Sequence, residues 1–154
     1  MTEEILRKAH DFAETYSQCC KAHVGAAIIR DKKCIALEAN TTSPHNCRQS
    51  GCHRVLVYGS NSKQHRLPSD CYAIHAEIKA IAAAAIRCET TACATIYVTR
   101  YPCEACARAI VAAGITKVVY SGIEEISEQT AKIFHKASVE VEYVPIAWGD
   151  DTVE

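Results

Sequence analysis

The chain of 154 residues lacks a basic excess: 17 lysine and arginine residues stand against 18 aspartate and glutamate residues, for a formal net charge of −1. Nucleic acids are held largely through their phosphates, so this balance argues against a long nucleic acid as partner, while a small anionic substrate needs only a local basic group. No stretch approaches the roughly eighteen consecutive apolar residues of a membrane span. The acidic N-terminal segment is unlike a secretory signal. We therefore expect a cytoplasmic protein without a membrane partner.

Cysteine, in contrast, is abundant, with residues at positions 19, 20, 34, 47, 52, 71, 88, 93, 103 and 106. Many cysteines in a secreted chain indicate disulfides, but without a secretory signal we expect metal ligands and free thiols. Two of them form a C-x-x-C pair in the run Pro102-Cys103-Glu104-Ala105-Cys106. This pair is one half of the most informative feature of the sequence.

The other half is His75-Ala76-Glu77. One imidazole from His75 and two thiolates from Cys103 and Cys106 make three ligands for a tetrahedral Zn²⁺ ion, whose fourth position stays open for water. Such water ionises near neutral pH and attacks electrophilic carbon, and Glu77 is placed to carry its protons. Backbone amides near Ala76 and Cys103 are candidates to polarise substrate oxygens.

A C-x-x-C pair is also found in structural zinc sites and redox pairs. A closed structural site needs a fourth protein ligand, for which Cys71 and Cys88 are the candidates. Nothing in a structural site explains a glutamate two residues after the ligand histidine. The pattern therefore favours a catalytic centre.

Residue periodicity predicts helices over 3–18, 74–87, 103–113 and 124–136, and strands over 24–29, 34–39, 95–99, 117–120 and 139–143. Strands that alternate with helices indicate crossover connections, so we expect an α/β fold: a three-layer α/β/α sandwich around a mixed five-stranded sheet. The alanine-rich helix over 74–87 is expected to be buried on most sides. Residues 41–70 form an irregular Cys/His-rich insert, and the tail from 145 has no predicted element.

With these residues in hand, the chain resembles the zinc-dependent cytidine deaminase superfamily, whose signature is H-x-E followed by P-C-x-x-C. Within it, the deoxycytidylate (dCMP) deaminases of phages and bacteria are the most similar. That likeness rests on the Cys19-Cys20 pair, on Asn40, and on the segments 23–29, 46–47, 97–99 and 114–120. It implies a cytidine deaminase-like fold in one domain over residues 1–154.

The resemblance also implies an activity, the hydrolysis of dCMP to dUMP and ammonia, which supplies dUMP for thymidylate synthesis. It makes Glu77 the catalytic acid and base. It assigns substrate contacts to Asn40, at the sugar hydroxyl, and to Tyr101, at the pyrimidine and sugar, beside the contact already expected at Ala76. Members of the family are often hexamers regulated by dCTP and dTTP.

Two departures from the family pattern bear on regulation and on phosphate binding. Ala39-Asn40-Thr41 stands where the family has Tyr-Asn-Gly, which puts regulation by dCTP and dTTP in question. Lys79 stands where the family has asparagine, and it is either a solvated helix residue or a phosphate contact. Arg48 and Arg54 in the insert are further candidates for the phosphate.

Some family members hold a second, structural zinc at positions matching Cys19 and Cys47. The resemblance therefore suggests a second Zn²⁺ bound by Cys19, Cys47 and Cys71, with Cys52 or His53 as the fourth ligand; the alternative is a set of free thiols. The remaining residues Cys34, Cys88 and Cys93 are interpreted as core cysteines.

Two other functions stay open. One is deamination of another base or nucleoside, such as cytosine, guanine or adenosine, with a tRNA substrate disfavoured by the balanced charge. The other is a catalytically silent zinc protein that binds nucleotides, against which the intact Glu77 argues.

Overall fold

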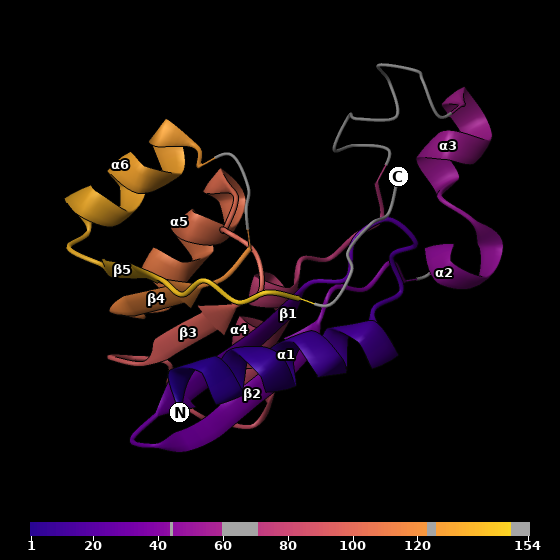
Figure 1. The fold of residues 1–154 in the computed structure, drawn as a ribbon. Coiled ribbons are helices and arrows are strands. Elements are labelled where there is room, and N and C mark those ends of the chain that lie inside the picture. Colours follow the sequence, from indigo (N-terminus) through magenta and orange to yellow (C-terminus); the bar gives the residue numbers. More distant parts are fainter. Residues whose placement is uncertain (44, 60–70, 123–125, 149–154) are drawn as a thin grey trace.

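A mixed sheet of five strands forms the centre of the fold (Figure 1). The computed structural model describes residues 1–43, 45–59, 71–122 and 126–148. The strands are β1 (Gly25–Arg30), β2 (Lys33–Ala39), β3 (Thr95–Val98), β4 (Lys117–Tyr120) and β5 (Glu140–Tyr143). They lie in the order β2-β1-β3-β4-β5; β1 is antiparallel to both neighbours, while β3, β4 and β5 run parallel. The predicted mixed five-stranded sheet is confirmed.

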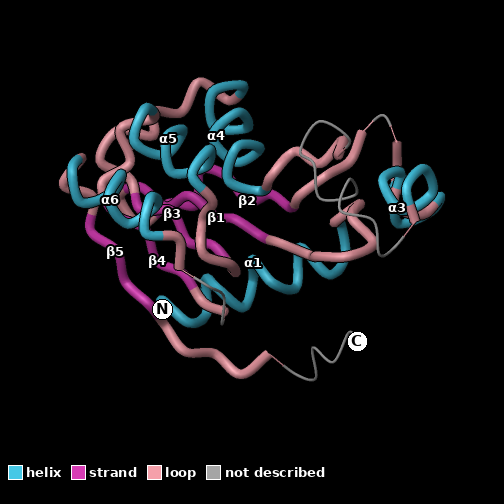
Figure 2. Tube along the Cα trace, turned by 90° about the horizontal axis from the view of Figure 1, so that it is seen from above, coloured by secondary structure: helices cyan, strands magenta, loops and turns pink. Residues whose placement is uncertain are grey.

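Helices cover both faces of this sheet (Figure 2). One face is covered by α1 (Thr2–Tyr16), and the other by α4 (Ala76–Ile86), α5 (Glu104–Ala112) and α6 (Glu128–Lys136). Side chains alternate along each strand, so β3 sends Ile96 into the larger apolar cluster under α4, α5 and α6, and Tyr97 into the smaller one under α1. The result is the expected three-layer α/β/α arrangement.

The contact between α1 and β1 depends on a glycine. A Cβ atom built on Gly25 would overlap the backbone carbonyl oxygen of Ala9, so the helix crosses the strand where no side chain intervenes. Leu6, Ala9 and Ala13, which are fully buried, form the face of α1 that meets the sheet. Only glycine permits so close a backbone approach at this position.

The insert expected to be irregular contains two short helices, α2 (Cys47–Ser50) and α3 (His53–Tyr58). Asn46 begins the first of them, because its side chain accepts hydrogen bonds from the backbone amides of Arg48 and Gln49. Residues 44 and 60–70 of the insert lie outside the described residues. The helix expected from residue 124 begins at Glu128, after the capping residue Ser127, and 123–125 also lie outside the description.

The prediction that α4 is buried on most sides is wrong. Its buried residues are Ala76, Glu77, Ala80 and Ala84, whereas Ile86 is 82% exposed. A helix that packs on a sheet buries one stripe, and alanines supply too little side chain for other elements to cover the opposite face.

Three cysteines interpreted as core residues are also exposed, namely Cys34, Cys88 and Cys93. Cys88 and Cys93 have positive φ angles of 57° and 60°, which place them in the turns on either side of the short connection between α4 and β3. The tail, for which nothing was predicted, packs under α1, and Trp148 stacks on His10 with 4.4 Å between ring centroids. Within the described ranges, no helix is both long and apolar enough to cross a membrane.

Candidate active site

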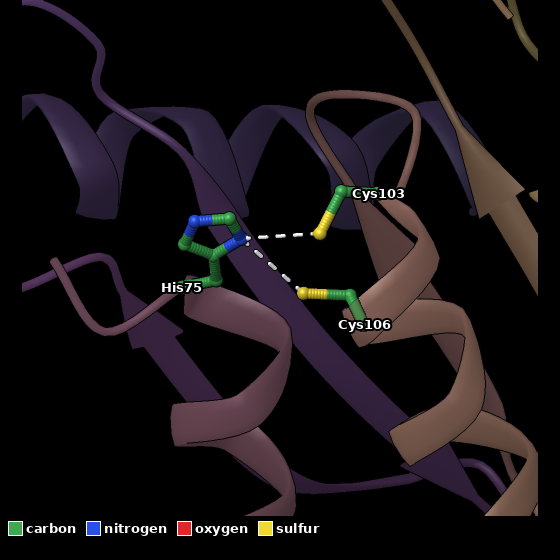
Figure 3. Close-up of side chains that lie close together, drawn as sticks. All are labelled: His75, Cys103 and Cys106. Carbon is green, nitrogen blue, oxygen red and sulfur yellow. Dashed lines mark hydrogen bonds between the residues drawn. The ribbon is translucent and has the colours of Figure 1, made fainter. Parts of the chain in front are cut away.

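The two sequence motifs meet where α4 and α5 begin (Figure 3). His75 is the residue that precedes α4, and Cys103 is the residue that precedes α5, with Cys106 one turn further on. The Nδ1 atom of His75 lies 3.5 Å from Sγ of Cys103 and 3.4 Å from Sγ of Cys106. Residues that are 28 positions apart in the chain are thus brought into one cluster.

The geometry of this cluster fits a zinc ion. Zn–N bonds of about 2.0 Å and Zn–S bonds of about 2.3 Å at a tetrahedral angle separate nitrogen from sulfur by about 3.5 Å. The ligand atoms of His75, Cys103 and Cys106 all lie within 4.8 Å of one another, and among the described residues they are the only such group. Neither Cys71 nor Cys88 belongs to this group. Among the described residues, no fourth protein ligand therefore closes the site.

One side of the cluster faces solvent. Cys106 is 1% exposed, whereas His75 and Cys103 are exposed residues. A metal bound by these one buried and two exposed residues would keep a coordination position accessible to water, as catalytic zinc sites require.

Hydrogen bonding within the cluster favours a thiolate. Two hydrogen bonds lower the pKa of the Cys103 thiol to about 3. The bond with the Cys106 thiol has the larger effect, and the bond with His75 comes second. The same hydrogen bond with Cys103 raises the pKa of Cys106. The cluster therefore favours the thiolate form of Cys103, which is the form that binds a metal ion.

Glu77 lies beside these ligands on the first turn of α4. It is 4% exposed, and burial raises the pKa of its carboxyl group above the ordinary value. The positive charge of His75 and the nearby Cys106 thiol oppose this rise in the pKa of Glu77. A buried carboxylate with a raised pKa next to a metal site is suited to accept and return protons near neutral pH.

A further charge near the site was not singled out in the sequence. The pKa of His75 is raised, chiefly by its hydrogen bond with Cys103, and the positive charge of Arg100 opposes that rise. The only signal available for Arg100 was its position, three residues before Cys103.

The three predicted substrate contacts differ in their surroundings. Ala76 is fully buried and is the first residue of α4, where backbone amides have no acceptor within the helix. Tyr101 is 9% exposed and lies in the turn between β3 and α5. Asn40 follows β2 and is 6% exposed.

The side chain of Asn40 takes part in three hydrogen bonds inside the protein. Its Oδ1 accepts from the Ser17 hydroxyl at 2.6 Å and from the backbone amide of Val24 at 3.0 Å. Its Nδ2 donates to the carbonyl oxygen of Ala22 at 2.8 Å. A primary amide nitrogen carries two hydrogens, so one donor remains for a ligand.

The basic residues considered for the phosphate have protein partners. Lys79 forms an ion pair with Glu38 of β2 at 3.4 Å, and Arg48 donates to the carbonyl oxygens of Thr15 and Ser17 at 3.3 and 3.2 Å. Arg54 hydrogen-bonds the thiol of Cys52. The ion pair favours a structural role for Lys79 over a phosphate contact.

The predicted second metal site is not assembled as a compact group. Within the described residues, Cys19, Cys47 and Cys71 are not part of any three-ligand cluster. The pKa of Cys20 is raised by burial and then by the nearby thiols of Cys19, Cys52 and Cys47, so these four sulfurs share one neighbourhood. Cys20 was not proposed as a ligand, although the Cys19-Cys20 pair was a signal for it.

Comparison with known proteins adds to this geometry. A family model described as the cytidine and deoxycytidylate deaminase zinc-binding region matches residues 1–122. The chain is 34% identical over 141 residues to the deoxycytidylate deaminase of Saccharomyces cerevisiae, covering 90% of this chain and 43% of that protein. It is also 34% identical over 114 residues to the deoxycytidylate deaminase of Mycobacterium phage D29, covering 68% of this chain and 81% of that protein.

A solved structure has the same fold. The dCMP deaminase from the cyanophage S-TIM5, in complex with dCMP and dUMP, matches with a TM-score of 0.70 and 23% identity, covering 92% of this chain and 95% of that one. Because the family model covers most of the sequence, the chain belongs to the cytidine and deoxycytidylate deaminase family defined by this zinc-binding region. The resemblance inferred from the motifs is confirmed, while the chain spans less than half the length of the yeast relative.

Proposed function

We propose that this protein catalyses the zinc-dependent hydrolytic deamination of dCMP to dUMP and ammonia, supplying dUMP for thymidylate synthesis. The observation that carries the proposal is the three-ligand cluster of His75, Cys103 and Cys106 with the buried Glu77 beside it. The activity named for the yeast and phage relatives supports dCMP as the substrate.

The residues at the site divide the reaction between them. When bound, a zinc ion supplies the Lewis acidity that lets water lose a proton near neutral pH. Glu77 accepts that proton while the water oxygen adds to C4 of the cytosine ring. Glu77 passes this proton to N3, then accepts the second proton from the C4 hydroxyl and gives it to the amine as the C4–N bond breaks, so dCMP and water yield dUMP and ammonia. Burial of Glu77 keeps bulk water from competing for these transfers.

Substrate contacts follow from the elements around the cluster. The remaining amide hydrogen of Asn40 is assigned to a sugar hydroxyl, and the ring of Tyr101 to the pyrimidine and sugar. The backbone amide of Ala76, at the start of α4, is assigned to a pyrimidine acceptor. The roles of Asn40 and Tyr101 come from the family resemblance, and the role of Ala76 comes from its place at the helix start. Burial beside the metal ligands supports the roles of Tyr101 and Ala76.

A second, structural zinc is a separate part of the proposal. Its candidate ligands are Cys19, Cys47 and Cys71, with Cys52 or His53 as the fourth. The closeness of Cys19, Cys47 and Cys52 to Cys20 supports a thiol-rich site, with Cys20 as a further candidate. Zinc content separates the alternatives, because two ions per chain support the site and one ion refutes it.

At the level of the whole protein, we propose a single deaminase domain over residues 1–154 that acts in the cytoplasm as a homo-oligomer, with a hexamer as the expected form. The exposed apolar side of α4, which includes Ile86, supports association. Binding of dCTP or dTTP is proposed from the resemblance, and Ala39-Asn40-Thr41 is the sequence that bears on it.

The decisive test is product analysis on a substrate panel. Ammonia release and the deaminated product are measured with dCMP, CMP, deoxycytidine, cytosine, guanine and adenosine, each with and without dCTP. We expect dCMP to give the highest kcat/KM. Turnover of a free base or a purine nucleoside with dCMP inert would show another deaminase of the same fold, and no turnover of any compound would favour a silent binding protein.

A further inference from the structure

Three tyrosines line up across the carboxyl ends of the parallel strands. Tyr101 follows β3, Tyr120 ends β4 and Tyr143 ends β5. Ring centroids are 4.8 Å apart between Tyr101 and Tyr120, and 5.2 Å apart between Tyr120 and Tyr143. In α/β folds this edge of the sheet is where ligands bind, so the row lies on the functional side of the molecule.

The contact between the first two rings is specific in geometry. Their planes meet at 70°, which is the edge-to-face arrangement that aromatic quadrupoles favour. Tyr101 and Tyr120 are 9% and 7% exposed, so the contact is shielded from water. Tyr143, at 47% exposed, covers the far side of Tyr120. Tyr120 is therefore held between a ring near the site and a ring at the surface.

The backbone around Tyr101 is fixed, but the orientation of its ring depends on the contact with Tyr120. Pro102 restricts the conformation of the residue before it and is itself fully buried, which fixes the chain that leads into Cys103. The side-chain rotamer of Tyr101 is not fixed by the proline. Among the described residues, Tyr120 is the one aromatic partner of that ring.

We infer that Tyr120 is a positioning residue for substrate binding: its ring, packed edge to face, sets the orientation in which Tyr101 meets the pyrimidine and sugar. The inference rests on the proposed function, because it needs Tyr101 to contact the substrate. The ring contacts of Tyr120 are with Tyr101 and Tyr143, and we expect it to act on the substrate through Tyr101. Its loss is therefore expected to change substrate affinity and leave the chemical step intact.

The test compares Tyr120→Leu and Tyr120→Phe in the zinc-loaded protein. An aromatic pair contributes roughly a threefold to tenfold factor in affinity, so Tyr120→Leu is expected to raise KM for dCMP by about that factor with kcat within about twofold. Tyr120→Phe keeps the ring and is expected to restore the wild-type KM. If the leucine variant does not fold, Tyr120→Met takes its place.

Tyr97→Leu is the matched control. Tyr97 is 8% exposed, similar to Tyr120, but it faces α1 on the other side of the sheet. Tyr97→Leu is expected to lower the melting temperature about as much as Tyr120→Leu does, and to leave KM for dCMP unchanged. A merely structural role for Tyr120 would make the two leucine variants behave alike, which would overturn the inference.

A double-variant comparison tests the route through Tyr101. In a Tyr101→Ala background, Tyr120→Leu is expected to cause no further change in KM. Additive effects on KM, or an unchanged KM in folded, zinc-loaded Tyr120→Leu, would refute the inference while leaving the proposed function intact. A wild-type protein inert on dCMP refutes the proposed function instead, and the same variants are then compared on the pyrimidine that the substrate panel identifies.

Discussion

The hydroxyl of Ser17 donates a 2.6 Å hydrogen bond to Oδ1 of Asn40, and the two side chains are 2% and 6% exposed. Ser17 directly follows α1, whereas Asn40 directly follows β2. This bond joins the end of the first helix to the strand that leads into the proposed sugar contact. It also fixes which end of the Asn40 amide is the donor, because both acceptor positions of Oδ1 are used.

Removing the Ser17 hydroxyl tests how much this hydrogen bond contributes to the free energy of unfolding. Ser17→Ala leaves a buried amide oxygen with one donor fewer, which is expected to lower the free energy of unfolding by about 1–2 kcal/mol. Thr15→Ala is the control, because the Thr15 hydroxyl is exposed and bonds within its own helix. Chemical denaturation measures both. Equal losses of unfolding free energy in the two variants would show that the buried Ser17–Asn40 bond stabilises the fold no more than an exposed hydroxyl does.

The role of Glu77 is tested by Glu77→Gln, which keeps the size of the side chain and removes its ability to accept a proton. Turnover of dCMP is expected to fall by about 10²–10⁴-fold, with zinc retained, because general acid–base catalysis typically contributes that much. Glu104→Gln is the control on the neighbouring helix, where the half-exposed Glu104 pairs with Arg108. Steady-state kinetics that show equal activity in both variants would remove Glu77 from the mechanism.

The pH dependence follows from the burial of Glu77. Its pKa is raised by burial, so on acidification it becomes protonated at a higher pH than an exposed glutamate does. The protonated form cannot accept the water proton. We therefore expect log kcat/KM to fall with a unit slope on the acidic side, with a midpoint above the ordinary glutamate value of about 4.3. Zinc content is measured at each pH. If kcat/KM falls in step with the loss of zinc, the acidic decline reports protonation of the metal ligands and not of Glu77.

The ligand assignment predicts a shared outcome for three variants. His75→Ala, Cys103→Ala and Cys106→Ala each remove one of three ligands, and each is expected to lose zinc and activity together. Cys88→Ala is the control, since Cys88 is exposed and lies outside the cluster. Elemental analysis of the purified proteins decides. Full zinc retention in all three ligand variants would contradict the assignment.

The crossing of α1 over β1 predicts a large stability effect far from the chemistry. Gly25→Ala places a methyl group on the carbonyl oxygen of Ala9, so the helix or the strand must shift, and the free energy of unfolding is expected to fall by about 2 kcal/mol or more. Gly59→Ala is the comparison, because no atom of the described residues lies within 4 Å of its added Cβ, although its φ of +77° carries a smaller cost. Thermal melting that ranks Gly59→Ala as the worse of the two would show that the close approach is tolerated.

Much of the fold could be predicted because its strands and longer helices carry clear periodicity. The zinc cluster was predictable too, since His75, Cys103 and Cys106 lie in short motifs at helix starts, where local sequence decides the geometry. The two short helices of the insert were missed, because four and six residues are too few to show a helical period.

Other features depend on partners distant in sequence. Asn40 was identified from the resemblance, yet its bonds to Ser17, Ala22 and Val24 could not be inferred before the strand and the preceding segment were placed together. The exposed side of α4 was missed because alanine is compatible with both burial and exposure. Cys88 and Cys93 were misplaced because thiols are usually buried, whereas here they occupy turns with positive φ.

The central claim is that a metal ion at His75, Cys103 and Cys106 makes this chain a deaminase, and a metal-reconstitution titration tests it most directly. Zinc is removed with a chelator, added back in steps, and dUMP formation from dCMP is measured at each zinc-to-protein ratio. We expect no activity without metal and a rise that is proportional to occupancy of this site. Full activity in protein shown to be free of metal would contradict the account.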